Sequence, residues 1–320
     1  MRQNNFKFGL TIILILIAIV PVWGVKAKKK TADPEEVLRQ GREAFLNYDF
    51  ENAADLFDEY RSLQKKSKKD VSEEFEAWEK EMDIASGAFE RVQKIVVIDS
   101  ISVPASTFYK NYKLSKSSGD LGTLTDLAQS APLKTEEVGF SNEERDYFII
   151  PVENKDGELR LTEIYRLLDG TWEINETLQG DFDKTGDYFY PFMSGDGQTL
   201  YFANDGEESM GGLDIFVAQR DPSTGEYLQP LNVGMPFNSP YDDMMMALDE
   251  ENGIGWWATD RDRNDGNVTV YVYLIEDIRK NYNEDTENLV NLAKLTDYKT
   301  TWEEGKEEDY KQKQRIYKVN

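Results

Sequence analysis

The side chains with the clearest potential for chemistry form a run of alternating oxygen ligands late in the chain. Asp260, Asp262 and Asn264 occupy alternate positions ahead of Gly266. Carboxylate and amide oxygens spaced in this way before a glycine are what a Ca²⁺-binding loop requires. The glycine comes one place later than in an EF-hand, and Tyr271 stands where a glutamate would close the loop. The run therefore predicts either a calcium site made by Asp260, Asp262 and Asn264 or an ordinary turn between strands.

A second candidate set consists of carboxylates. Asp181, Asp183 and Asp187 precede the pair Glu207 and Glu208. Two carboxyl groups held a few ångströms apart can cleave glycosides, one as general acid and the other as base or nucleophile. Nothing in the spacing of these residues sets such a separation, so solvated acidic loops are the competing interpretation.

A third candidate is aromatic. Trp256 and Trp257 are followed by Tyr271 and Tyr273. Exposed aromatic rings could form a binding surface that stacks on sugars or holds a peptide. Aromatic residues that alternate along strands are also typical of a core between sheets, and both interpretations stay open.

Composition excludes whole classes of chemistry. The 320 residues contain no histidine and no cysteine. Catalysis by Ser-His-Asp or Cys-His groups, imidazole and thiolate metal sites, disulfides and a cysteine-linked lipid anchor are therefore excluded. The formal net charge of −24 repels nucleic acid and anionic lipid surfaces. No cofactor is expected, apart from calcium at the site described above.

The elements that would position these residues form a repeat. Aromatic pairs occur at Tyr147–Phe148, Tyr201–Phe202 and Trp256–Trp257, with spacings of 54 and 55 residues. Around the central pair, residues 188–234 contain four short apolar runs separated by turn clusters such as Asp196-Gly197. Four antiparallel strands in under about 50 residues is the size of one propeller blade. The competing interpretation is an ordinary antiparallel sandwich.

The central unit contains a set of residues with a recognisable spacing: Ser194, Asp196, Gly197, Tyr201, Phe202, Gly211, Gly212, Asp214, Ile215 and Phe216. This set resembles the WD40-like repeat of TolB-type propellers, in the version found in cell-envelope proteins of the Bacteroidota. The resemblance implies a β-propeller-like fold of about three to four blades and location in the envelope. It implies association with peptidoglycan only through a partner, because no OmpA-type segment is recognisable in these residues.

Residues 31–90 are predicted to be helical. Gly41, Ala44, Phe50, Ala53 and Phe57 lie at helical spacing and resemble one tetratricopeptide unit, in which Gly41 would face Ala53. A plain helical hairpin packed on the β domain is the alternative.

Two further segments bear on how the repeat array ends. Residues 92–103 read as a strand that enters the β domain, and we expect it to supply the first strand of a small or incomplete propeller. Residues 104–133 read as irregular, and one arrangement is that both segments build part of a fourth blade beside residues 136–180. Residues 276–320 return to helix as a C-terminal extension, in which 302–318 are predicted to be a surface helix or a flexible tail. A partner or a second copy could also cover an exposed sheet edge, and the sequence does not decide the oligomeric state.

The first 27 residues read as a signal peptide. A short apolar run follows Arg2 and Lys7, and Val25-Lys26-Ala27 fits a signal-peptidase site. The mature protein is then periplasmic or associated with the outer membrane. The alternative is a single N-terminal membrane anchor, because lysines just beyond the run oppose translocation.

These expectations combine into an α+β multidomain protein. Its parts are the signal peptide (1–27), a tetratricopeptide-like helical domain (31–90), a propeller-like domain (92–275) and the helical extension (276–320). The predicted function is that of an exported, non-catalytic envelope scaffold that binds other envelope proteins. The alternative is a glycan-binding or glycan-cleaving envelope protein that uses carboxylates, with or without calcium.

Overall fold

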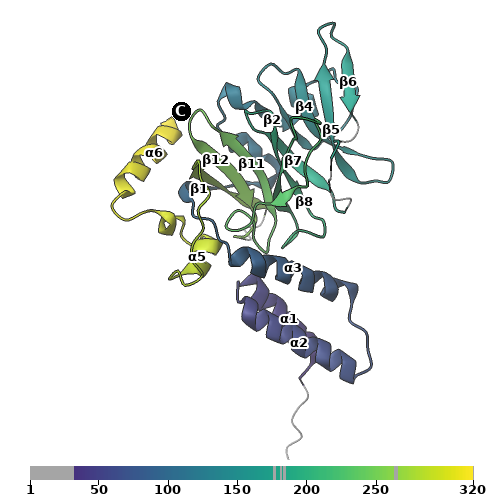
Figure 1. Ribbon diagram of the computed structural model, residues 1–320, viewed down its shortest axis with the longest axis vertical. Helices are drawn as coiled ribbons and strands as arrows, with labels where there is room; N and C mark the ends of the chain where they lie inside the picture. Colours follow the sequence, from purple (N-terminus) through teal and green to yellow (C-terminus); the bar gives the residue numbers. More distant parts are fainter. Residues whose placement is uncertain (1–31, 176–177, 181, 183–184, 263–265, 320) are drawn as a thin grey trace, which may run out of the picture. The chain divides into compact units, whose positions relative to one another are not determined.

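The computed structural model describes residues 32–319 apart from 176–177, 181, 183–184 and 263–265 (Figure 1). Residues 34–320 form one compact unit that contains helices and three antiparallel sheets. The predicted signal peptide lies outside the described residues. In the part of the chain that the structure describes, no helix is both long and apolar enough to cross a membrane.

Three helices begin the unit, where the periodicity predicts them: α1 (Pro34–Leu46), α2 (Phe50–Lys66) and α3 (Glu73–Phe89). The hydroxyl of Ser72 caps α3 by accepting a hydrogen bond from the amide of Phe75 at 3.2 Å. The apolar stripes of the three helices form a core together with Met210 and Met235 from the β region. The helices are therefore packed directly on the β region.

The close approach of α1 and α2 is made at Gly41, but its neighbour differs from the prediction. A Cβ built on Gly41 would lie 2.6 Å from the Phe57 ring and 3.3 Å from Leu56 Cβ. Gly41 thus faces Phe57 rather than Ala53. The phenyl ring uses the space that a side chain at position 41 would need.

We expect Gly41→Ala to destabilise the protein by about 1–3 kcal/mol, because the added methyl group overpacks this crossing. Gly87 is the matched control, since it is also helical and its built Cβ meets only an arginine side chain at 3.9 Å. Gly87→Ala should raise stability by up to about 1 kcal/mol through helix propensity. Urea unfolding measures both, and losses of equal size would contradict the packing argument.

The β region consists of three sheets. The first has the order β2-β3-β4-β5-β6, the second β10-β9-β8-β7 and the third β1-β13-β12-β11. Strands of the first sheet are β2 (Asp120–Thr123), β3 (Val138–Ser141), β4 (Tyr147–Glu153), β5 (Leu159–Arg166) and β6 (Trp172–Asn175). Those of the second are β7 (Tyr188–Met193), β8 (Thr199–Asn204), β9 (Asp214–Gln219) and β10 (Leu231–Asn232). The third contains β1 (Val96–Pro104), β11 (Asp243–Asp249), β12 (Ile254–Thr259) and β13 (Asn267–Leu274).

The three sheets repeat the same local features. Each has a tight turn between its first two repeat strands, with a left-handed residue at Arg145, Gly197 or Gly253. In the second and third sheets the first repeat strands are β7 and β11, and both are bulged. Tyr190 lies in the bulge of β7 and Met245 in that of β11, each with a positive φ. In addition, β7 packs on β3, β4 and β5, and β11 packs on β7, β8 and β9. The first repeat strand of each later sheet therefore packs on the sheet that precedes it.

The strand predicted at residues 92–103 forms as β1, the first strand of the β region, but it does not join the sheet of residues 136–180. β1 pairs antiparallel with β13 from Val96↔Leu274 to Pro104↔Asn267, and so completes the third sheet. It takes the outer position that β6 and β10 hold in the other two sheets. The first strand of the β region thus joins the last of the three sheets, and it is not paired with β4 or β5.

The segment after β1 is more ordered than predicted. It contains two 3₁₀ helices, η1 (Ala105–Asn111) and η2 (Lys116–Ser118), then β2, and the short helix α4 (Leu124–Leu127). Its aromatic residues Phe108 and Tyr112 are buried in the main core.

The C-terminal region covers the free edge of β1. It contains α5 (Leu289–Lys294), η3 (Tyr298–Thr301) and α6 (Glu307–Val319), and α6 lies against β1 (Figure 1). The Val97 amide donates to Thr301 Oγ1 at 3.0 Å, and Trp302 Nε1 donates to the Val97 carbonyl at 2.7 Å. The extension is therefore an integral part of the unit.

Candidate functional site

A cavity of about 720 Å³ lies between the second and third sheets. One wall is a row of cross-strand neighbours on β8, β9 and β10. Tyr201 pairs with Val217, and Val217 pairs with Leu231. The period of two along each strand places these side chains on one face of the sheet, so together they make a continuous apolar surface.

The opposite wall comes from the third sheet. Met246 and Leu248 lie two residues apart on β11, and Tyr273 of β13 lies across the sheet from them. Between these strands, Gly255 leaves room for the Tyr273 ring, because a Cβ at this position would lie 2.4 Å from it. Phe237 adds a further ring, packed edge-on to Tyr273 with centroids 5.1 Å apart. The interior of the cavity is therefore apolar and aromatic.

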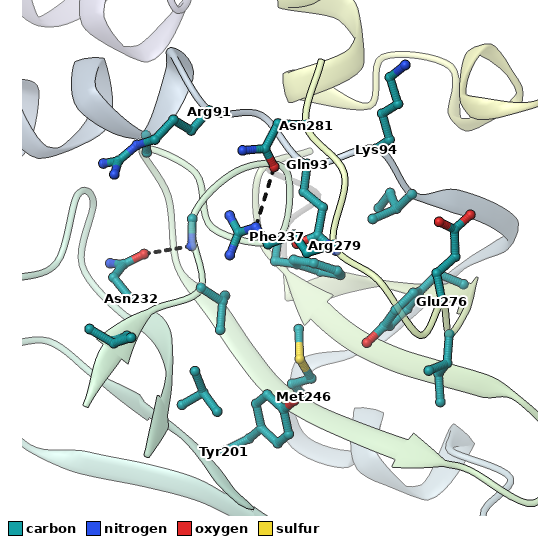
Figure 2. Close-up of a pocket in the computed structure, with 18 of the residues that line it drawn as sticks. Arg91, Gln93, Lys94, Tyr201, Asn232, Phe237, Met246, Glu276, Arg279 and Asn281 are labelled. Atoms are coloured by element: carbon teal, nitrogen blue, oxygen red, sulfur yellow. Dashed lines mark hydrogen bonds between the residues drawn. The ribbon is translucent and has the colours of Figure 1, made fainter. Parts of the chain in front are cut away.

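The mouth of the cavity is polar and carries positive charge. Arg91 and Lys94 come from the segment between α3 and β1, whereas Glu276 and Arg279 follow β13. Figure 2 shows Arg279 beside Phe237, with a weak hydrogen bond of 3.5 Å from its Nε to Asn281 Oδ1. Among the described residues, no carboxylate forms an ion pair with Arg91, Lys94 or Arg279.

The two arginines affect one another. Partial burial lowers the pKa of Arg279, and the positive charge of Arg91 lowers it further. An arginine stays protonated in spite of such shifts. The two guanidinium groups therefore repel one another, and an anion near both would offset this repulsion.

The sequence motif mostly builds the scaffold around this cavity. Asp196 Oδ1 accepts hydrogen bonds from the amides of Gln198 and Thr199, which fixes the turn with Gly197 in its left-handed conformation. Other motif residues are buried in the sheet or at its ends: Ser194, Phe202, Gly211, Asp214, Ile215 and Phe216. Gly212 is exposed, with a φ of 92°. Of the motif residues, Tyr201 is the one that lines the cavity.

A buried polar cluster lies where the α1–α2 turn meets the β region. Asp243 is fully buried and pairs with Arg261 at 2.7 Å, and it also accepts a hydrogen bond from Ser239 at 2.6 Å. Tyr48, in the turn between α1 and α2, is buried near both charges, and burial raises its pKa. Asp214 lies close enough for the charge of Asp243 to raise its pKa. Sequence reasoning did not find this cluster, because its members are far apart in the chain.

Asp214 should make stability depend on pH. Burial raises the pKa of its carboxyl group well above the ordinary value, and the charge of Asp243 adds to this. The folded state therefore keeps a proton that the unfolded state releases above about pH 4, so the stability contributed by Asp214 falls as pH rises. Asp214→Asn has no such proton. We expect the variant to gain stability relative to the wild type between about pH 5 and pH 8 in urea unfolding. Equal pH dependence in the two proteins would contradict this.

The predicted calcium ligands take part in local hydrogen bonds. Asp260 Oδ1 accepts from the amide of Asp242 at 2.9 Å, and Asp262 Oδ2 accepts from the hydroxyl of Thr269 at 2.5 Å. Asn264 lies outside the described residues. Among the residues that the structure describes, no three acidic side chains are grouped as a metal site would need. Calcium binding at this loop stays a prediction.

The acidic candidates that the structure describes take part in local contacts. Asp187 Oδ1 accepts a hydrogen bond from the amide of Leu159 at 2.8 Å, and Glu207 pairs with Lys80 at 3.2 Å. Glu208 is exposed. Asp181 and Asp183 lie outside the described residues.

Trp256 and Trp257 do not form an exposed binding surface. Their exposed fractions are 1% and 0%. Trp257 stacks on Tyr271 at 4.9 Å, and Trp256 stacks on Tyr112 at 6.0 Å. Successive residues of a strand point to opposite faces, so the pair fills the cores on both sides of the third sheet.

Comparisons of the chain with protein-family models, with curated proteins and with solved structures found no match. The resemblance to TolB-type repeats therefore rests on the motif residues alone.

Proposed function

We propose that the protein is an exported, non-catalytic cell-envelope scaffold that binds partner proteins. The observation that carries this proposal is the apolar cavity whose mouth holds Arg91 and Arg279 without ion pairs. Cavities of about 300–1,000 Å³ with apolar walls and a few polar groups are typical binding sites. The absence of histidine and cysteine from the 320 residues supports a binding role rather than catalysis.

The proposed scaffold is a small propeller-like array of three sheets. Its support is the shared strand order, the shared turn and the packing of each sheet on the first strand of the next. In this proposal β1, the N-terminal strand of the β region, supplies the outer strand of the last sheet. A propeller ring that is closed by its N-terminal strand needs this arrangement. The helices α1–α3 offer a second surface for docking.

The proposed location is the periplasm or the outer membrane, after cleavage near Ala27. The short apolar run and the Val25-Lys26-Ala27 site support it. N-terminal sequencing of the protein purified from its native source should begin near Lys28. A sequence that begins at Met1 or Arg2 would favour the membrane anchor instead.

Affinity capture from an envelope extract tests the binding role. The wild-type protein, the variant Arg91→Gln/Arg279→Gln and the control Arg145→Gln are immobilised in parallel. Arg145 is a suitable control, because it is half exposed and pairs with Asp120 on the first sheet. A protein retained by the wild type and the control should be lost with the double variant. The scaffold proposal fails if no protein is retained above background by any of the three.

A further inference from the structure

We propose that the cavity binds the carboxyl-terminal end of an extended, apolar peptide from the partner protein. This inference rests on the proposed scaffold function and specifies the ligand. In this arrangement the terminal carboxylate binds at Arg91 and Arg279, and the last side chains enter the apolar interior.

The mouth has the donors that a carboxylate needs. Each guanidinium group carries five N–H donors, and one carboxylate can accept from both. Arg91 donates to the Gly87 carbonyl at 3.2 Å and Arg279 to Asn281 at 3.5 Å, both through Nε, so the terminal nitrogens of both side chains stay available. Gln93 also lines the mouth, with a half-buried side chain (Figure 2). A carboxylate would gain these bonds and remove the repulsion between the two arginines.

The second sheet offers an open edge at the same place. Its outer strand β10 has two residues, whereas β6 has four and β1 has nine. Leu231 of β10 is 66% exposed and belongs to the apolar row that forms the cavity wall. Extended peptides commonly bind by pairing with such an edge while alternate side chains enter a pocket. A peptide beside β10 would cover Leu231 and direct its end toward the arginines.

Charge argues against segments of this chain as the occupant. The N-terminal region carries Lys26, Lys28, Lys29 and Lys30, which the cationic mouth would repel. The C-terminal end is already held elsewhere, since Lys113 Nζ donates to the Tyr317 carbonyl at 3.2 Å. A partner chain end with a free carboxylate fits the charge of the mouth better than either.

The test is selection from a display library of short random peptides with free carboxyl termini, followed by titration of synthetic versions. We expect selected peptides to end in apolar residues. Amidation of the terminus should weaken binding about tenfold or more, because it removes the charge-assisted hydrogen bonds. Arg91→Gln/Arg279→Gln should weaken binding to a similar extent, and Arg145→Gln should not. Thermal unfolding shows whether each variant is folded.

Each other outcome overturns the proposal. A library without binders, or peptides that bind equally well after amidation, would exclude a chain end as the ligand. Binding that survives the double arginine substitution would place the peptide outside the cavity. Titration with oleate is the last arm: arginine-dependent binding of oleate without any selected peptide would make the cavity a fatty-acid site. Capture of an envelope protein that survives the double substitution would keep the scaffold function and overturn this inference alone.

Discussion

Replacing Asp243 with asparagine should lower the free energy of unfolding by about 3–5 kcal/mol, because it leaves a buried arginine without its counter-charge. The exposed fractions of the two side chains are 0% for Asp243 and 4% for Arg261. Arg261 also donates to the carbonyls of Pro236 and Phe237 at 3.0 and 2.8 Å, so it cannot turn toward solvent without losing these bonds. Burial raises the pKa of Asp243 to about 6, and the guanidinium of Arg261 opposes the rise. Urea unfolding at about pH 8, where this carboxyl group is ionised, measures the effect.

The matched control is an ion pair of similar length on the surface. Asp120 and Arg145 are 2.7 Å apart, and about half of each side chain is exposed. Asp120→Asn should change stability by no more than about 1 kcal/mol, because water screens the pair. The double variant Asp243→Leu/Arg261→Met should recover much of the loss, since an apolar pair removes both buried charges. If Asp243→Asn behaved like Asp120→Asn, the buried pair would not contribute to stability as argued.

Removing residues 297–320 should destabilise the protein by roughly 5 kcal/mol and make it associate with itself. The truncation deprives the Val97 amide and carbonyl of their partners in Thr301 and Trp302, a net loss of about 0.5–1.5 kcal/mol for each hydrogen bond, because water then reaches both groups. It also removes the buried rings of Tyr310 and Tyr317, each contributing about 1.5–3 kcal/mol. The uncovered β1 would then present a free edge to other molecules. Size-exclusion chromatography with light scattering, together with urea unfolding, checks both effects.

A shorter truncation separates the two contributions. Removing residues 307–320 takes away both tyrosines and leaves Thr301 and Trp302 on β1. This protein should be less stable than the wild type but remain monomeric. Self-association of both truncations to the same extent would show that α6, and not the contact at Val97, protects the edge. A monomeric longer truncation with wild-type stability would refute the proposed edge cover.

Local patterns were enough to predict the elements and the repeat. The helical spacing around Gly41 and Phe57 predicts α1 and α2, because an amphipathic helix must bury one stripe. The Asp196-Gly197 turn and the aromatic pairs 54 and 55 residues apart predict three similar sheets, since turn chemistry and strand period act over a few residues. The absence of histidine and cysteine likewise excludes classes of chemistry without any structure.

Only the tertiary structure decided how distant segments meet. The pattern of residues 92–103 identifies a strand, but its pairing with β13 depends on which sheet edge is free after the whole chain has packed. The same holds for the cavity. Arg91 and Arg279 stand in segments without a motif, and they lie together because β1 and β13 are neighbours. Trp256 and Trp257 are equally ambiguous in sequence, and their burial depends on the sheets and helices that cover both faces of β12. Strand pattern specifies which residues share a face, whereas packing alone determines what that face contacts.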